Sequence, residues 1–224
     1  MKNLLKPLLF SCLTAAALLS CTSKPANTVA QSSATLKTDT AKVITPAIIQ
    51  NSPPETTEEI KRAYQETDAL LGKNQLDSTT FEYNCNNEKS GTVTFYTDHD
   101  QLRLIKHNYS EYDHFSSSDS FFITGDKLFF VYKKSIVWSF ESGPEGSTKD
   151  DVTESRSYFI NEKPMKCLEK KYTIHSQSPD KPQPDQLSSK EVSCKESPAL
   201  LTQYKLLLSH QNKPNKGCLD QQSK

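Results

Sequence analysis

The stretch SDSFFITGDKLFFVYK, residues 118–133, decides the fold. Two short apolar runs flank Gly125-Asp126, and such a pair between apolar runs is typical of a two-residue β-hairpin. The second run is apolar at both alternating sets of positions, so a strand formed there would bury both of its faces. We therefore predict a central strand at 127–133 that carries core side chains on both sides, at Leu128, Phe129, Phe130, Val131 and Tyr132.

Short runs rich in Thr, Val, Ile, Phe and Tyr continue on both sides of this hairpin. Turn residues separate them, at 98–100 and at 161–164 for example. Such close succession predicts an antiparallel meander, as a curved sheet or half-barrel, instead of parallel βαβ units. The predicted strands are 79–85, 91–97, 101–109, 118–124, 127–133, 135–141, 153–160 and 165–174.

The strand predicted at 135–141 alternates clearly between apolar and polar residues. Ile136, Trp138 and Phe140 are expected to point inward, with Trp138 as an anchor of the core. The following polar, proline-rich stretch, 175–189, is expected to be a loop with little to pack against.

Two helices are expected to flank the sheet. Thr56 and Glu59 have the spacing of a capping box, and apolar residues at helical spacing follow until Gly72, which predicts a helix over 57–72. A second helix is expected over 198–210, with Leu200, Leu201, Tyr204, Leu207 and Leu208 on one face. The fold class is therefore α+β, mainly β, in a single domain over 55–224.

The amino terminus has the pattern of a secretory signal peptide. Lys2 and Lys6 precede an apolar run over 8–19, which at about twelve residues is too short for a spanning helix of about 20. Leu18-Leu19-Ser20-Cys21 resembles a lipobox, so we expect removal of residues 1–20 and acylation, including palmitate, on Cys21. An ordinary signal peptide followed by an unmodified cysteine is the alternative.

The residues after Cys21 suggest where the protein resides. Thr22 stands where an aspartate would favour inner-membrane retention, and Ser23-Lys24-Pro25 stands where surface-exported lipoproteins carry acidic residues. We therefore expect a lipid anchor in the cell envelope, at the outer membrane and facing the periplasm. Residues 22–54 are polar and lack aromatic residues, which predicts that 21–54 is a flexible tether.

The charge of the chain excludes some partners. The formal net charge is 0, and removal of Lys2 and Lys6 with the signal peptide leaves about −2. Such a balance does not favour binding to nucleic acid or to an anionic membrane surface. The membrane is therefore expected as a partner only through the lipid, with an envelope protein or a small apolar ligand as further candidates.

Four cysteines besides Cys21 remain after processing: Cys85, Cys167, Cys194 and Cys218. In an oxidising compartment they are expected to form disulfides, and three pairings are open. We favour Cys85 with Cys167 and Cys194 with Cys218. No CxxC pair occurs and the spacings do not fit a zinc site, so neither a thioredoxin-like role nor a bound metal is expected.

No catalytic motif stands out, so no catalytic residue is assigned and no cofactor is expected. The chain has no nucleophile elbow, no glycine-rich phosphate loop and no HExxH. Histidine and acidic residues gather at 98–100 and at His107, Asp113 and His114, where a metal or acid/base site is conceivable, although the first group is also a turn signal. Aromatic residues would line a ligand groove if the sheet curled, and core packing is the competing explanation: Phe121, Phe129, Tyr132 and Trp138.

Two resemblances bear on function. The segments GTVTFYTDHDQLRLI (91–105), KLFFVYK (127–133) and RSYFINEKPMKCLEK (156–170) resemble uncharacterised lipoproteins of Bacteroidetes. Tyr83-Asn84-Cys85 followed by VTFYT is similar to the opening strand of periplasmic C-type lysozyme inhibitors, which implies a small β-barrel, although their inhibitory Ser-Gly-x-x-Tyr loop is missing. We expect a non-enzymatic binding or envelope-structural module. An inhibitor of a lysozyme-like hydrolase and a carrier of a lipid or other apolar ligand are the alternatives.

Overall fold

The computed structural model describes residues 52–213 and 217–219. The described residues belong to one unit, Ala47–Lys224. The signal peptide, Cys21 and the tether up to residue 51 lie outside the described residues, so those predictions stay predictions.

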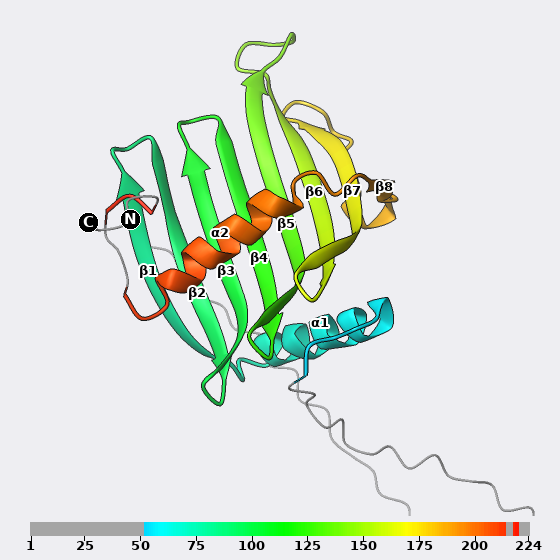
Figure 1. Ribbon diagram of the computed structural model, residues 1–224. Coiled ribbons are helices and arrows are strands. Elements are labelled where there is room, and N and C mark those ends of the chain that lie inside the picture. The colour runs from blue at the N-terminus through cyan, green and yellow to red at the C-terminus, as the bar shows by residue number, and fades with distance from the viewer. Residues whose placement is uncertain (1–51, 214–216, 220–224) are drawn as a thin grey trace, which may run out of the picture. The chain divides into compact units, whose positions relative to one another are not determined.

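Eight antiparallel strands form one sheet in which sequence neighbours always pair, in the order β1-β2-β3-β4-β5-β6-β7-β8 (Figure 1). This confirms the predicted α+β class and the meander, and the sheet does not close into the small barrel that the similarity to the lysozyme inhibitors implies. The strands are β1 (Asp77–Cys85), β2 (Lys89–Asp98), β3 (Gln101–Glu111), β4 (Phe115–Thr124), β5 (Lys127–Phe140), β6 (Thr148–Ile160), β7 (Lys163–His175) and β8 (Lys190–Val192).

Two strand predictions were wrong in detail. The strands expected at 127–133 and 135–141 are one strand, β5, because Lys133, Lys134 and Ser135 pair without a break with Ser155, Glu154 and Thr153 of β6. The short edge strand β8 was not predicted, since three exposed residues give no periodic signal.

The predicted turns are confirmed by their backbone conformation. Gly125 and Asp126 have φ of 56° and 57°, as a two-residue hairpin of the primed type requires. His99 and Asp100 adopt the same left-handed region, with φ of 48° and 64°. The adjacent hairpins keep the strands in sequence order, which generates the meander.

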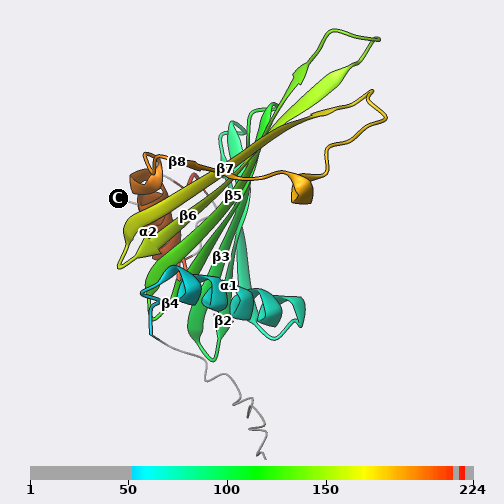
Figure 2. The ribbon, with the colours of Figure 1, turned by 90° about the vertical axis from the view of Figure 1, so that its right-hand side faces the viewer.

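Helix α1 (Thr57–Gly72) packs on one face of the sheet, against β4 and β5 (Figure 2). Its predicted capping box is present: the Thr56 side chain accepts from the Glu59 backbone, and the Glu59 carboxylate accepts from the Thr56 backbone. Tyr64 makes edge contacts with Phe122 and Phe130, at ring-centroid distances of 5.0 and 5.4 Å. We call this side of the sheet the α1 face.

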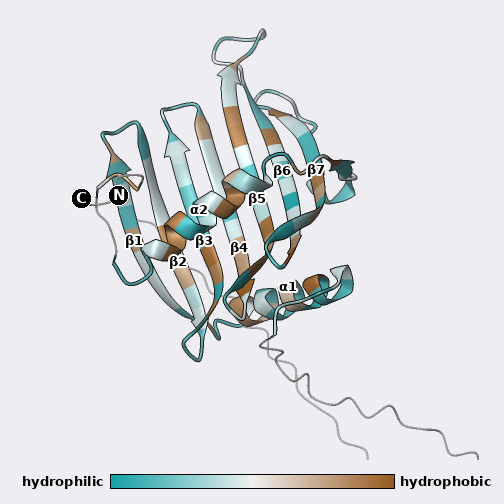
Figure 3. Ribbon diagram, viewed as in Figure 1, coloured by the Kyte–Doolittle hydropathy of each residue, from teal (hydrophilic) through white to brown (hydrophobic). Residues whose placement is uncertain are grey.

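Helix α2 (Ser197–Ser209) lies across the opposite side, which we call the α2 face (Figures 1 and 2). Leu200, Tyr204 and Leu207 are buried there, as predicted, whereas Leu201 and Leu208 are partly buried. They pack on residues that alternate with those under α1, so Phe121 faces α2 while Phe122 faces α1. The central strands are therefore covered on both sides, and Figure 3 shows apolar residues along the parts of the strands behind α2.

Both ends of α2 are held by disulfides, which form between pairs other than those we favoured. Cys194, just before α2, bonds to Cys167 of β7, and Cys218, after α2, bonds to Cys85 of β1. The favoured Cys85–Cys167 pair was wrong because β1 and β7 lie toward opposite edges of the sheet, six positions apart in strand order. We call α2, with the flanking segments that carry Cys194 and Cys218, the C-terminal strap.

The prediction that Trp138 and Phe140 belong to the core was also wrong. The end of the β5–β6 hairpin extends beyond β4 and beyond both helices (Figure 1), so neither helix covers it. Phe140 is 72% exposed, and Trp138 is only half-buried, with its indole N–H donating to the Asp113 carbonyl. Alternation places Ile136, Trp138 and Phe140 on one face of β5. The strand is long enough, however, to carry Trp138 and Phe140 beyond the core.

Candidate functional site

A buried polar network under α2 gathers the side chains with the most catalytic potential. His107 of β3 and Asp119 of β4 are direct cross-strand neighbours. Gln203 of α2 lies between them, with its amide nitrogen 3.0 Å from His107 Nδ1 and 2.9 Å from Asp119 Oδ2. The network ends in Tyr83, whose hydroxyl is 2.8 Å from His107 Nε2, and in Ser117, which donates to Asp119 Oδ1 at 2.6 Å.

The surroundings of His107 keep its ring neutral. Burial, helped by the charges of Lys89 and Lys133, lowers its pKa to about 3. Because Gln203 donates to Nδ1, the ring proton is assigned to Nε2, which then donates to Tyr83. Burial also raises the pKa of Asp119, and Ser117 and Gln203 oppose that shift.

This network is closed to solvent. His107 is 1% exposed and Asp119 is 0% exposed, because the strap covers both. A substrate cannot reach either side chain without displacing α2. The hydroxyl of Ser117 also points to Asp119 and not to His107, so the three do not form a nucleophile, base and orienting acid in sequence. We interpret the network as the polar anchor of α2.

A second buried network lies on the α1 face of β6 and β7. The ammonium of Lys170 is 2.9 Å from Glu154 Oε2, and Tyr172 donates to the other oxygen at 2.9 Å. Lys170 also donates to the Pro184 carbonyl, and Arg156 donates to the Ser189 hydroxyl. The proline-rich loop thus closes this ion pair, and the prediction that the loop packs against little was wrong.

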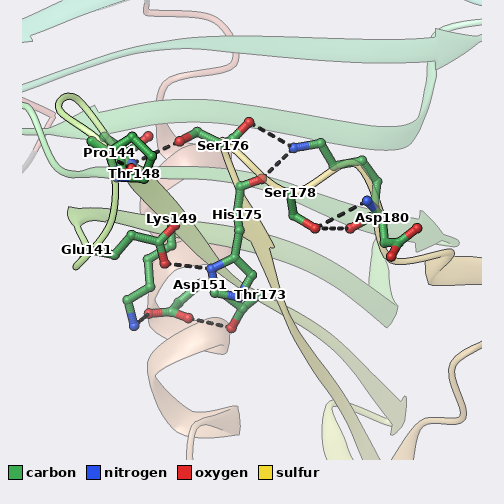
Figure 4. Close-up of polar contacts among 12 residues, drawn as sticks. Glu141, Pro144, Thr148, Lys149, Asp151, Thr173, His175, Ser176, Ser178 and Asp180 are labelled. Atoms are coloured by element: carbon green, nitrogen blue, oxygen red, sulfur yellow. Dashed lines mark hydrogen bonds and ion pairs between the residues drawn. The ribbon is translucent and has the colours of Figure 1, made fainter.

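A third polar cluster lies where β6 begins and β7 ends (Figure 4). Glu141 and His175 approach to 2.6 Å, Thr173 donates to Asp151 at 2.7 Å, and the Thr148 backbone donates to Ser176. Most of these contacts join neighbouring strands and loops at the surface. They attach the 141–147 loop and the start of the 176–189 loop to the sheet.

The histidine and acidic residues singled out in the sequence do not assemble a metal site. Asp98 contacts His99 at 2.7 Å and Arg103 at 3.3 Å, within one hairpin. His107 is buried under α2, whereas Asp113 and His114 lie in the β3–β4 turn, where His114 packs on Trp138. Among the described residues, no group of three or more His, Cys, Asp or Glu side chains could hold a metal ion.

The aromatic candidates for a ligand groove are dispersed. Phe121 packs on Tyr204 under α2, and Phe129 packs on Phe122 in the core of the α1 face. Tyr132 lies under the Arg156 guanidinium, 5.3 Å from it, and Trp138 is on the projecting hairpin. Core packing and surface contacts account for all four, so they do not line a common cavity.

An open polar hollow in the sheet was not foreseen. It has a volume of about 1100 Å³ and involves only β1 to β4. Because Phe81 and Tyr83 belong to the core under α2, the residues that alternate with them point to the opposite, α1 face. The lining side chains of that face are Thr80, Glu82, Asn84, Ser90, Thr92, Asn108, Ser110 and Ser116.

The strand register arranges all of these side chains except Thr80 in two rows across the sheet, which we call the polar rows. The first row runs through Asn84, Ser90, Ser110 and Ser116. The second row runs through Glu82, Thr92 and Asn108. Alternation in the sequence showed that these positions are polar, but only the register shows that they adjoin.

Most of the hydrogen-bonding capacity of the polar rows is unused. Thr80 bonds to Thr94 and Asn84 bonds to Asn87. Within the part of the chain that the structure describes, five further side chains of the hollow make no hydrogen bond to protein: Ser90, Thr92, Asn108, Ser110 and Ser116. Their hydroxyl and amide groups are free to bind a ligand.

A smaller cavity of about 230 Å³ lies between α1 and the sheet. Tyr64, Phe130 and Tyr158 line it, together with Arg156 and Lys61. Pockets for small molecules usually measure about 300 to 1,000 Å³, so this space is too small for a lipid chain.

Comparison with protein-family models, with curated proteins and with solved structures finds no match to the chain. Tyr83 and Cys85 carry the similarity to lysozyme inhibitors. In this fold Tyr83 belongs to the polar network under α2, and Cys85 forms a disulfide with Cys218. In residues 52–213 and 217–219, neither helix has the length and apolar character needed to span a bilayer.

Proposed function

We propose that this chain is a lipid-anchored protein of the bacterial cell envelope that binds a polar envelope component without transforming it. Cys21 would hold it to the outer membrane, with the domain in the periplasm. The observation that carries the binding role is the open hollow on β1 to β4, lined by hydroxyl and amide groups with no partner in the described protein.

Access to solvent supports binding over catalysis. The networks around His107 and Glu154, which contain buried titratable groups, are covered, one by α2 and the other by the 176–189 loop, and the buried Asp98 is paired with Arg103. The hollow is accessible, but its only titratable lining side chain on the α1 face is Glu82. A pair of groups for acid and base chemistry is therefore lacking where a ligand would enter.

The same geometry disfavours a carrier of apolar molecules. The buried apolar side chains of the sheet form two clusters, one with residues of α2 and the other with residues of α1. The cavity next to α1 is small, and the side chains that line the large hollow on the α1 face carry hydroxyl, amide or carboxylate groups. The first space is too small for an acyl chain and the second is open to solvent, so neither encloses an apolar ligand.

The proposal is tested by sedimentation of the purified full chain with cell-envelope fragments from the bacterium that encodes it, after detergent has removed the membrane lipid so that the proposed acyl anchor has nothing to insert into. Ser110→Tyr fills the hollow with a large side chain that suits a strand. Ser139→Tyr makes the same change on the projecting part of β5, outside the hollow. We expect the wild type and S139Y to co-sediment and S110Y to bind at least tenfold more weakly.

Two results would contradict the proposal. One is a wild-type chain that stays in the supernatant with envelope fragments. The other is S110Y binding as well as S139Y, which would place the binding surface elsewhere. Circular dichroism of both variants establishes that they are folded before binding is compared.

A further inference from the structure

The chemistry of the hollow restricts the class of its ligand, provided that the hollow is the binding surface proposed above. Its lining contains no lysine or arginine, so a phosphate or carboxylate would lack a counter-charge. The aromatic residues next to it, Phe81, Tyr83 and Tyr109, pack on the opposite face of the sheet, in or against the core under α2. A charged ligand and an acyl chain are both poor matches for such a surface.

Hydroxyl and amide groups, by contrast, match a ligand that is itself rich in hydroxyl groups. Each serine or threonine hydroxyl can donate one hydrogen bond and accept others, and the Asn108 amide does both as well. Glu82, as a carboxylate at the outermost strand, accepts hydrogen bonds from neighbouring hydroxyls. These groups can satisfy many hydroxyls of an uncharged ligand at once.

The spacing of the polar rows favours an elongated ligand. Neighbouring strands lie about 4.8 Å apart, so the first row, from Asn84 to Ser116, spans about 14 Å over four strands. The spacing between neighbouring strands is comparable to the length of one sugar ring in a linear glycan. The second row runs parallel to it, about 7 Å further along the strands, and can contact the other edge of the same rings.

We propose that the hollow binds a neutral, linear oligosaccharide laid across β1 to β4. Three or so successive sugar rings would lie along the first polar row, with Ser90, Ser110 and Ser116 contacting one edge. Thr92 and Asn108 of the second row would contact the other edge. The volume of about 1100 Å³ is ample for a ligand of this size.

The experiment is a competition in the sedimentation assay described above. Envelope fragments are digested, and the soluble products are separated into neutral oligosaccharides, acidic oligosaccharides and peptides. Each fraction is added to the wild-type chain bound to undigested fragments. We expect the neutral fraction to release the protein and the other two to leave it bound.

A matched pair of variants locates the contact. Thr92→Val removes one hydroxyl from the second polar row and keeps the branched shape. Thr153→Val makes the identical change in β6, away from the hollow. Loss of one neutral hydrogen bond weakens affinity about fivefold, so we expect T92V to bind the neutral oligosaccharides about fivefold more weakly than T153V.

The outcomes separate the ligand class from the binding role. If S110Y abolishes binding to fragments but only the peptide or the acidic fraction competes, the oligosaccharide proposal is overturned and the binding role stands. The oligosaccharide proposal is also overturned, and the binding role again stands, if the wild type still binds fragments from which all glycans have been removed and S110Y does not. Absence of binding to fragments altogether overturns both.

Discussion

At the scale of single residues, His107 shows how packing overrides the ordinary behaviour of a side chain. Its ring stacks on Tyr109 at 4.5 Å, bonds to Tyr83 and accepts from Gln203, all on the α2 face of the sheet. The sequence drew attention to this histidine as a site candidate. Its role is instead to satisfy polar groups beneath a helix, which requires the neutral ring.

This role predicts a pH dependence of stability. The pKa of His107 is near 6.5 in the unfolded chain and about 3 in the fold, so below pH 6.5 the unfolded chain binds a proton that the folded one excludes. The contribution is therefore complete above pH 6.5 and is lost as pH falls toward 3, at up to about 1.4 kcal/mol per pH unit. Asp119, whose pKa is raised, acts in the opposite sense.

The difference between wild type and His107→Gln isolates this contribution. Urea unfolding at pH 7.5 and pH 4.5 should show a larger loss of unfolding free energy for the wild type than for the variant. The NMR shift of the His107 ring proton should stay constant from pH 8 to pH 5. A shift that moves with a midpoint near pH 6 would contradict the buried, neutral ring.

Sequence reasoning at this scale succeeded where the residue's environment is local. The capping residues Thr56 and Glu59 and the hairpin pair Gly125-Asp126 act on near neighbours, and both were predicted. Trp138 failed because its burial depends on how far α1 and α2 extend over β5, which alternation does not encode. The same limit applies to Phe140.

At the scale of elements, the C-terminal strap determines what the sheet can do. It closes the α2 face by inserting Leu200, Tyr204 and Leu207 between the strands' side chains. Because α1 contacts β4 and β5, neither described helix packs on the part of the α1 face where the hollow lies. The location of the hollow thus follows from which strands each helix covers.

Removing the disulfide at the start of the strap should loosen it locally. The Cys167–Cys194 bond closes a loop of 27 residues, for which chain entropy gives about 3.5 kcal/mol. The double variant Cys167→Ser, Cys194→Ser should lose about 2 to 4 kcal/mol of unfolding free energy. Hydrogen exchange should accelerate in α2, with α1 as the internal control on the other face. Equal exchange of α2 in both proteins would contradict the role of the bond.

The elements themselves were largely predictable, and their pairing through cysteine was not. Residues 57–72 form a helix at the predicted positions, and the second helix differs from its prediction by one residue at each end. Disulfide pairing depends on the path of the strap across the sheet from β7 to β1. The spacing of the cysteines along the chain does not predict that path, so it does not predict the pairing.

At the scale of the whole molecule, the proposed anchor and the hollow belong to different parts of the chain. Cys21 precedes the folded domain by 36 residues, counted to Thr57 at the start of α1. The hollow is built entirely from residues 80–117. Anchoring and binding should therefore be separable by mutation.

Full-length protein made in a bacterium with a labelled fatty acid should carry the label and sediment with membranes. Cys21→Ala should abolish the label and release the protein from membranes, whereas Cys12→Ala, a change within the apolar run, should leave both unaffected. Release should not alter binding to envelope fragments. Acylation of C21A to the wild-type level would place the anchor elsewhere.

The fold class could be derived from the sequence because an antiparallel meander is specified by successive local hairpins. The hollow could not, because its side chains come from four strands and adjoin only through the register. Ser110, for example, lies just outside the strand predicted at 101–109, and no motif distinguishes Thr92. Pairwise contacts across strands turned them into a surface.

The bond between Cys85 and Cys218 has a consequence for biogenesis. If the chain is exported as proposed, translocation would deliver its cysteines in chain order, so Cys85 and Cys167 would both reach the oxidising side of the membrane before Cys218. A bond formed between those two would join strands from distant parts of the sheet and would have to be exchanged before the native pairs could form. For an exported chain we therefore expect maturation to require a disulfide isomerase whenever oxidation outpaces export.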